Sequence, residues 1–111
     1  DTVDCAVMYV YEEDGEFYFT KKRKEVGQHY TLKNVIQETA YKAKLTLTKF
    51  RIFKCGRHWV NMQEIDMHEH AGKSVKEYVE DKKKDPKAYF VVDMLNTSER
   101  KNRPSPYEMK M

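Results

Sequence analysis

Two histidines and two acidic residues gather in the stretch 66–70, DMHEH, where a metal ion could bind. A zinc site needs three or four ligands, mostly nitrogen and sulfur, that converge on one point. His68 and His70 could supply two of them, and the nearest upstream candidates are Cys55 and His58. Their spacing matches no established ligand pattern, so we expect a polar exposed loop and no metal site.

The adjoining stretch 70–74, HAGKS, ends like a phosphate-binding loop. Such a loop needs a second glycine five residues before Gly72, and it follows an apolar strand. Met67 occupies that position, and the preceding segment is polar. We therefore predict no nucleotide site and no cofactor.

Catalysis has little support in the sequence. Cys5 and Cys55 lie inside apolar runs, where cysteine is usually an inert core residue, and we expect no disulfide between them. No nucleophile and base stand at a spacing from which a catalytic pair can be argued. The chain is predicted not to be an enzyme.

Basic residues carry the clearest signal. Residues 1–20 hold six acids and no lysine or arginine, whereas residues 21–63 hold eleven basic residues and two acids. Segregation of this size can steer a domain towards an acidic partner. It is equally expected if acidic and basic segments are neighbours in the fold, and composition alone leaves both interpretations open.

A β-hairpin is predicted at the start of the chain. Residues 5–11, CAVMYVY, form an unbroken apolar run typical of a strand buried on both faces. Asp14-Gly15 is a favoured tight-turn pair. The returning segment, EFYFTKKRKEV, becomes basic halfway, and lysines at this density indicate an edge strand.

One amphipathic helix is predicted after Thr31, a suitable N-cap, because apolar residues follow at helical spacing from Leu32 to Ala43. Residues 49–56 indicate a half-buried strand, and HWVNM (58–62) a short partner strand. Ser74 and Glu77 have capping-box spacing, which favours a short second helix.

Residues 88–95, AYFVVDML, form a second apolar strand, which we place beside the first in the centre of the sheet. The element order indicates an α+β fold: a mixed β-grasp (ubiquitin-like) sheet with the main helix on one face. Residues 1–95 are expected to form this single domain, and residues 96–111 a polar tail or linker. A ferredoxin-like fold is the main competitor, but the Asp14-Gly15 turn argues against it.

The segments VMYVYEEDGEFYFTKKRKEV, KFRIFKCGRHWVNMQEI and AYFVV resemble, in order, the opening hairpin, the third strand with its glycine turn, and the closing strand of doublecortin-type domains. The resemblance lies in element order and turn positions over residues 5–95, and ubiquitin and Ras-association domains share much of it. The segment 66–87 is longer than the corresponding loop of doublecortin domains. The resemblance implies an acidic cytoskeletal partner, tubulin.

We therefore expect a non-catalytic protein-interaction module within a larger protein, binding an acidic partner or a second copy of itself. An alternative is a nucleic-acid-binding domain, in which the same side chains neutralise phosphates and stack on bases. The candidate partner-binding residues are Lys21, Lys22, Arg23, Lys24, Lys49, Arg51, Lys54, Arg57 and Trp59. Trp59 could instead be a core residue.

No apolar run approaches the length of a membrane span, and no signal-peptide pattern opens the chain. With only two cysteines, both in apolar runs, a cytoplasmic or nuclear location is expected.

Overall fold

A five-stranded mixed sheet forms the framework of the protein, whose computed structural model describes residues 1–80 and 86–95. The strands are β1 (Thr2–Glu13), β2 (Glu16–Gly27), β3 (Arg51–Cys55), β4 (Gln63–Ile65) and β5 (Lys87–Asp93). The main helix is α1 (Leu32–Lys42), and a short helix, α2 (Met67–His70), follows β4. Two single 3₁₀ turns, η1 (Arg57–Trp59) and η2 (Val75–Tyr78), complete the described elements.

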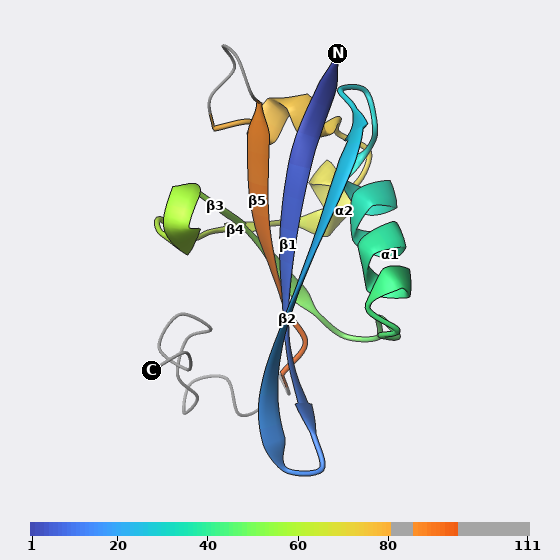
Figure 1. The fold of residues 1–111 in the computed structure, drawn as a ribbon, viewed down its shortest axis with the longest axis vertical. Helices are drawn as coiled ribbons and strands as arrows, with labels where there is room; N and C mark the ends of the chain where they lie inside the picture. Colours follow the sequence, from blue (N-terminus) through green and yellow to red (C-terminus); the bar gives the residue numbers. More distant parts are fainter. Residues whose placement is uncertain (81–85, 96–111) are drawn as a thin grey trace.

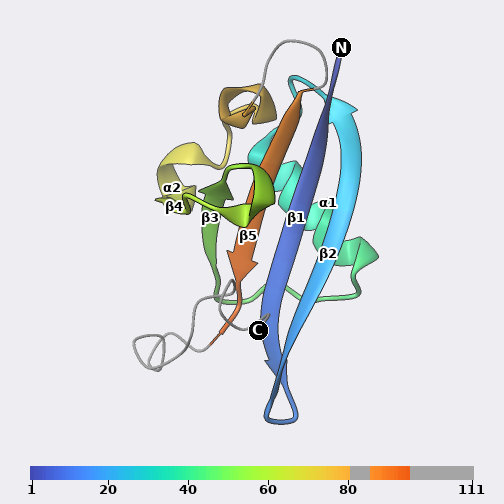
Figure 2. The same cartoon turned by 60° about the vertical axis from the view of Figure 1, so that its left-hand side comes forward.

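The strands lie in the order β2-β1-β5-β3-β4 (Figures 1 and 2). β1 is parallel to β5 and antiparallel to β2, while β3 is antiparallel to both β5 and β4. The first and last strands are therefore adjacent in the middle of the sheet, as predicted. β2 is an edge strand, which confirms the interpretation of its lysine density.

The hairpin that joins β1 and β2 extends beyond the rest of the sheet. Asp14 (φ 52°) and Gly15 (φ 80°) both adopt left-handed backbone conformations, as a two-residue turn of type I′ requires. The two strands pair along their full length, but β5 pairs with β1 only from Asp4 to Val10. The end of the hairpin consequently projects as a two-stranded ribbon (Figure 1).

Helix α1 packs against one face of the sheet and begins as the sequence predicts. The Thr31 side chain accepts a hydrogen bond from the backbone N–H of Asn34 at 3.2 Å, which caps the first turn. The buried stripe follows the predicted spacing and consists of Leu32, Val35, Ile36, Thr39 and Ala40. This stripe fixes which face of the sheet the helix covers.

The sheet is packed on both faces. Cys5, Val7 and Tyr9 of β1 point into the larger core under α1. Met8 and Val10 point to the opposite face, which no described helix of more than one turn covers, into a smaller cluster with Val91, Cys55 and Leu95. Burial on both sides explains why β1 has no polar alternation in its middle.

The region after β3 differs from the prediction. Residues 58–62 form no strand: η1 and the turn after it occupy this stretch, and the partner of β3 is β4. The segment from Met62 to Gly72, expected to be a loop, contains β4 and α2.

The second predicted helix is replaced by η2, a 3₁₀ turn in which Ser74 makes no capping hydrogen bond. The chain is held there by an isolated bridge between Thr31 and Ser74, and by a hydrogen bond from the N–H of Val75 to the carbonyl of Tyr30 at 2.8 Å. These contacts fix an extended backbone at Ser74 and leave only four residues for the turn.

The predicted tail, residues 96–111, lies outside the described residues. Within the described part of the chain, no helix has the length and apolar content needed to cross a lipid bilayer.

A buried hydrogen bond ties β1 to α1 and provides a test of this packing. The Tyr9 hydroxyl donates to the carbonyl of Ile36 at 2.7 Å and lies 2.6 Å from the hydroxyl of Thr39. We expect Tyr9→Phe to lower the free energy of unfolding by about 1–2 kcal/mol, because Ile36 and Thr39 both lose a buried hydrogen-bond partner. Tyr41→Phe is the matched control, since Tyr41 is 85% exposed. Urea unfolding measures both, and equal stabilities would contradict this packing.

Candidate protein-interaction surface

The four consecutive basic residues of β2, here called the basic run (residues 21–24), are divided between the two faces of the sheet. Residues directly opposite in an antiparallel pair share a face. Lys22 and Lys24 lie opposite Val7 and Cys5 and therefore face the α1 side. Lys21 and Arg23 lie opposite Met8 and Ala6, on what we call the helix-free face.

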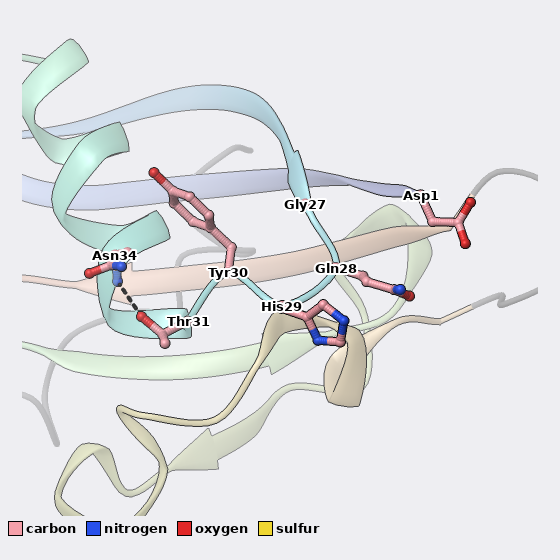
Figure 3. Close-up of a pocket in the computed structure, with 7 residues that line it drawn as sticks. All are labelled: Asp1, Gly27, Gln28, His29, Tyr30, Thr31 and Asn34. Carbon is pink, nitrogen blue, oxygen red and sulfur yellow. Dashed lines mark hydrogen bonds between the residues drawn. The ribbon is translucent and has the colours of Figure 1, made fainter.

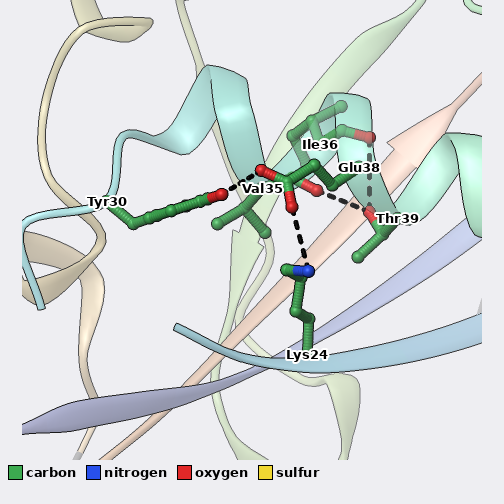
Figure 4. A network of polar contacts seen from close by, with 6 residues as sticks. All are labelled: Lys24, Tyr30, Val35, Ile36, Glu38 and Thr39. Atoms are coloured by element: carbon green, nitrogen blue, oxygen red, sulfur yellow. Dashed lines mark hydrogen bonds and ion pairs between the residues drawn. The ribbon is translucent and has the colours of Figure 1, made fainter. Parts of the chain in front are cut away.

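On the α1 side, Lys24 is bound to the helix. Its Nζ lies 2.9 Å from the Glu38 carboxylate, which also accepts a hydrogen bond from the Tyr30 hydroxyl (Figure 4). The hydrogen bond from Tyr30, and then that from Lys24, hold the pKa of Glu38 below its usual value. Lys24 thus joins β2 to α1, and its charge is already paired within the fold.

On the helix-free face, both arginines pair with carboxylates. Arg23 forms a salt bridge with Asp4 on β1. Arg51 binds Glu64 through two hydrogen bonds, of 3.0 and 2.5 Å, which raise the pKa of the guanidinium, and its guanidinium carbon lies 5.0 Å from the Phe53 ring centroid. A bidentate pair of this kind is directional as well as attractive.

Trp59 contacts residues of two different strands, β5 and β2, on the helix-free face. Its ring packs edge-on against Tyr89 of β5, with centroids 5.6 Å apart, and the Lys21 ammonium lies 5.7 Å from the ring centroid. Lys21 belongs to β2, whereas Trp59 follows β3 on the other side of the central pair. The turn therefore brings the tryptophan back across the sheet, where it is half-buried and joins the smaller core cluster.

Left-handed backbone conformations make this return possible. His58, Trp59 and Asn61 have φ values of 66°, 61° and 56°. Such a conformation is uncommon for a residue with a side chain, and each costs on the order of 1 kcal/mol. The loop is closed by hydrogen bonds between Gly56 and both Val60 and Trp59.

The other predicted residues lie elsewhere. Lys49 precedes β3, and Arg57 is exposed in η1. Lys54 lies opposite Phe90 on the α1 side and lines a pocket of about 190 Å³ with Gln63, Glu64, Ile65, His70 and Tyr78. Hence the structure groups Lys21, Arg23, Arg51 and Trp59 on one face, and places Lys22, Lys24, Lys49, Lys54 and Arg57 outside this group.

Sequence reasoning missed the partners of these residues: Asp4, Glu38, Phe53, Glu64 and Tyr89. A signal for the division of the basic run was nevertheless present. The two-residue turn at Asp14-Gly15 fixes the hairpin register, and that register alone places Lys24 opposite Cys5 and Lys21 opposite Met8. No feature of the sequence indicates in the same way that Trp59 contacts Tyr89.

The histidine stretch forms part of α2. The Asp66 side chain caps this helix by accepting a hydrogen bond from the N–H of His68 at 2.9 Å. His70 Nδ1 and the Tyr78 hydroxyl are buried and have no hydrogen-bond partner among the described residues. In residues 1–80 and 86–95, no three histidine, cysteine or acidic residues come together as a metal site would require.

A second pocket, of about 470 Å³, lies where β2 leads into α1 (Figure 3). Its lining residues are Asp1, Gly27, Gln28, His29, Tyr30, Thr31 and Asn34. Figure 3 shows the imidazole of His29 apart from the Asp1 carboxylate, with Gln28 between them. The pocket does not pair a base with a nucleophile, and Thr31 and Asn34 are already engaged in the helix cap.

Comparison of the chain with protein-family models, with curated proteins and with solved structures gives no match.

Both cysteines are buried and free. Burial raises the pKa of each thiol, Cys5 and Cys55, from 9.0 to about 12. The nucleophilic thiolate is therefore suppressed at neutral pH.

These thiols predict a loss of stability in alkali. Above pH 9 the unfolded chain releases both thiol protons while the folded chain keeps them until about pH 12, so stability falls as the pH rises. From pH 8 to 10 we expect the two thiols together to lower the free energy of unfolding by about 3 kcal/mol. Urea unfolding at each pH measures this. The double variant Cys5→Ala/Cys55→Ala should show a shallower fall, and an identical slope would contradict the assignment.

Proposed function

We propose that the chain is a β-grasp (ubiquitin-like) domain that acts as a non-catalytic protein-interaction module and binds an acidic partner through the β2 edge. The order β2-β1-β5-β3-β4, with a parallel central pair and one main helix on one face, supports the β-grasp assignment. The inert thiols support a role without catalysis, and two free cysteines fit a cytoplasmic or nuclear location.

One observation carries the proposal: a twelve-residue edge strand presents cations on both faces of the sheet. Arg23 and Lys24 are held by carboxylates within the chain, whereas Lys21 and Lys22 form no ion pair with any described residue. An extended acidic segment added beside β2 would meet one ammonium group on each face. Backbone pairing would supply affinity, and the two lysines would supply charge selectivity.

Trp59 extends this site onto the helix-free face. Its half-buried ring lies next to Lys21, so a side chain that reaches Lys21 from outside also reaches the tryptophan. Tryptophan beside a cation is a common composition of binding hot spots. As the single tryptophan of the chain, it also reports on binding by fluorescence.

A nucleic-acid partner is the less favoured alternative. Phe19, Phe53 and Tyr89 would offer stacking surfaces beside Trp59. However, Asp4 and Glu64 lie on the same face and neutralise the two arginines that would have to bind phosphate. A phosphate backbone laid along this face would meet carboxylates as often as cations.

Tubulin, implied by the resemblance to doublecortin-type domains, is one specific acidic partner within the proposal. Microtubule co-pelleting at low salt tests it separately from the general proposal. Absence of pelleting would exclude tubulin as the partner. Binding to other acidic segments is tested separately, with a peptide.

We expect a labelled peptide with the repeat Glu-Glu-Val-Val to bind, because adjacent glutamates of a strand point to opposite faces and can reach both lysines. Its counterpart with lysine in place of glutamate should not bind. Lys21→Glu/Lys22→Glu should weaken peptide binding at least tenfold, because two attractive contacts become repulsive. Fluorescence anisotropy of the peptide and Trp59 emission measure the effect.

The matched control is Lys33→Glu/Lys76→Glu, which makes the same charge change at two exposed lysines away from the edge. The proposal is wrong if both double variants lose binding equally, since net charge alone would then explain it. Tighter binding of a single-stranded oligonucleotide than of the acidic peptide, with a steep salt dependence, would establish the alternative.

A further inference from the structure

The β2 edge has a second property, a charge pattern that complements itself when the strand is reversed. Within the strand, residues 16–19 are acidic and aromatic, and residues 21–24 are basic, with Thr20 between them. The adjoining hairpin end, residues 12–14, adds three more acids. An antiparallel copy of β2 would thus bring the acidic, aromatic half of one strand alongside the basic half of the other.

We propose that β2 pairs antiparallel with β2 of a second copy of this chain, with the two-fold axis at Thr20. This inference rests on the proposed function, since it assigns a specific occupant to the same edge. Thr20 then lies opposite Thr20 of the partner. The remaining opposite pairs are Glu16 with Lys24, Phe17 with Arg23, Tyr18 with Lys22, and Phe19 with Lys21.

Each of these pairs sets a basic side chain opposite a carboxylate or an aromatic ring. A two-fold axis perpendicular to the sheet preserves the faces, so the members of every pair lie on the same side. Phe19 and Lys21 both belong to the helix-free face, where Lys21 would lie between Trp59 of its own chain and Phe19 of the partner. Aromatic and charge pairs opposite one another stabilise a sheet, and like charges opposite one another destabilise it.

Neighbouring registers are less favourable. An axis at Lys21 or Lys22 places that lysine opposite its own copy, and the Lys22 axis also sets Lys21 opposite Arg23. An axis at Phe19 avoids like charges but pairs only residues 16–22. The Thr20 register therefore gives the longest overlap within β2 without a like-charge pair.

The projecting hairpin supplies an independent reason for this pairing. Residues 11–18 extend beyond the part of β1 that β5 supports, and Phe17 and Tyr18 at its end are each 39% exposed. Isolated two-stranded ribbons are only marginally stable in water. In the proposed dimer, each hairpin end lies along the basic run of the other chain and gains a third strand there. The helices α1 stay on the same side of the joined sheet.

Cysteine cross-linking of the full chain tests the register. Opposite residues in an antiparallel pair have Cβ atoms about 4.5–5.5 Å apart, within reach of a disulfide after small adjustment. We expect oxidised Thr20→Cys to form covalent dimers at least tenfold faster than Glu25→Cys. Glu25 is exposed on the same strand but would lie opposite Gly15 of the partner. The native thiols, buried and protonated, contribute little background.

A charge exchange tests the energetics. Tyr18→Lys, at an exposed position, should weaken self-association about tenfold, because it places the introduced lysine opposite Lys22 in both symmetry-related pairs. The exchange Tyr18→Lys/Lys22→Glu should restore the association, and it leaves the ion pairs of Arg23 and Lys24 intact. Sedimentation equilibrium measures the association constant. The inference is overturned if the chain remains monomeric at millimolar concentration, or if Thr20→Cys and Glu25→Cys cross-link equally fast.

The acidic peptide separates this inference from the proposed function. If the peptide binds and dissociates the dimer, both stand, because the two occupants share one edge. If the peptide binds but no dimer forms, only the self-pairing is wrong. If the Thr20 register is confirmed but the peptide fails to bind, the acidic-partner proposal falls and self-pairing remains.

Discussion

The pairing of β1 on both of its edges is the constraint on which the rest of the structure depends. β1 pairs with β5 over Asp4–Val10 and with β2 along its whole length. This central position requires apolar side chains on both faces, and it leaves β2 at an edge. Because β2 follows β1 through a two-residue turn and pairs with it residue by residue, the edge strand is as long as β1. A long, basic, accessible strand is thus a consequence of the hairpin register.

The register also determines which cations are available for binding. Alternation along β2 sends Lys24 towards α1, where Glu38 holds it, and Arg23 towards Asp4. Lys21 lies beside Trp59, and Lys22 on the opposite face. A stretch that looks uniform in the sequence therefore divides into two residues that maintain the fold and two that make no ion pair with described residues. Mutating the whole run at once would mix these two roles.

Much of this architecture could be predicted because it is specified locally. Asp14-Gly15 determines the turn, Thr31 caps α1, and the apolar runs identify the central strands. The three-residue β4 could not be predicted, since it is too short to show any period and exists only through its pairing with β3. The position of Trp59 was equally inaccessible. It depends on left-handed conformations at three residues, and Trp59, unlike His58 and Asn61, belongs to a residue type that rarely adopts this conformation.

Lysines on an edge strand usually prevent pairing with other strands. In β2 the lysines are preceded, in the same strand, by one acidic and three aromatic residues: Glu16, Phe17, Tyr18 and Phe19. These residues can attract the lysines of a second copy. A basic edge alone would repel another copy in every register. Adding the acidic, aromatic half lowers that repulsion most where the strands run antiparallel and overlap about Thr20. Under the proposed function, this edge would exclude most strands and discriminate in favour of acidic or self-complementary ones.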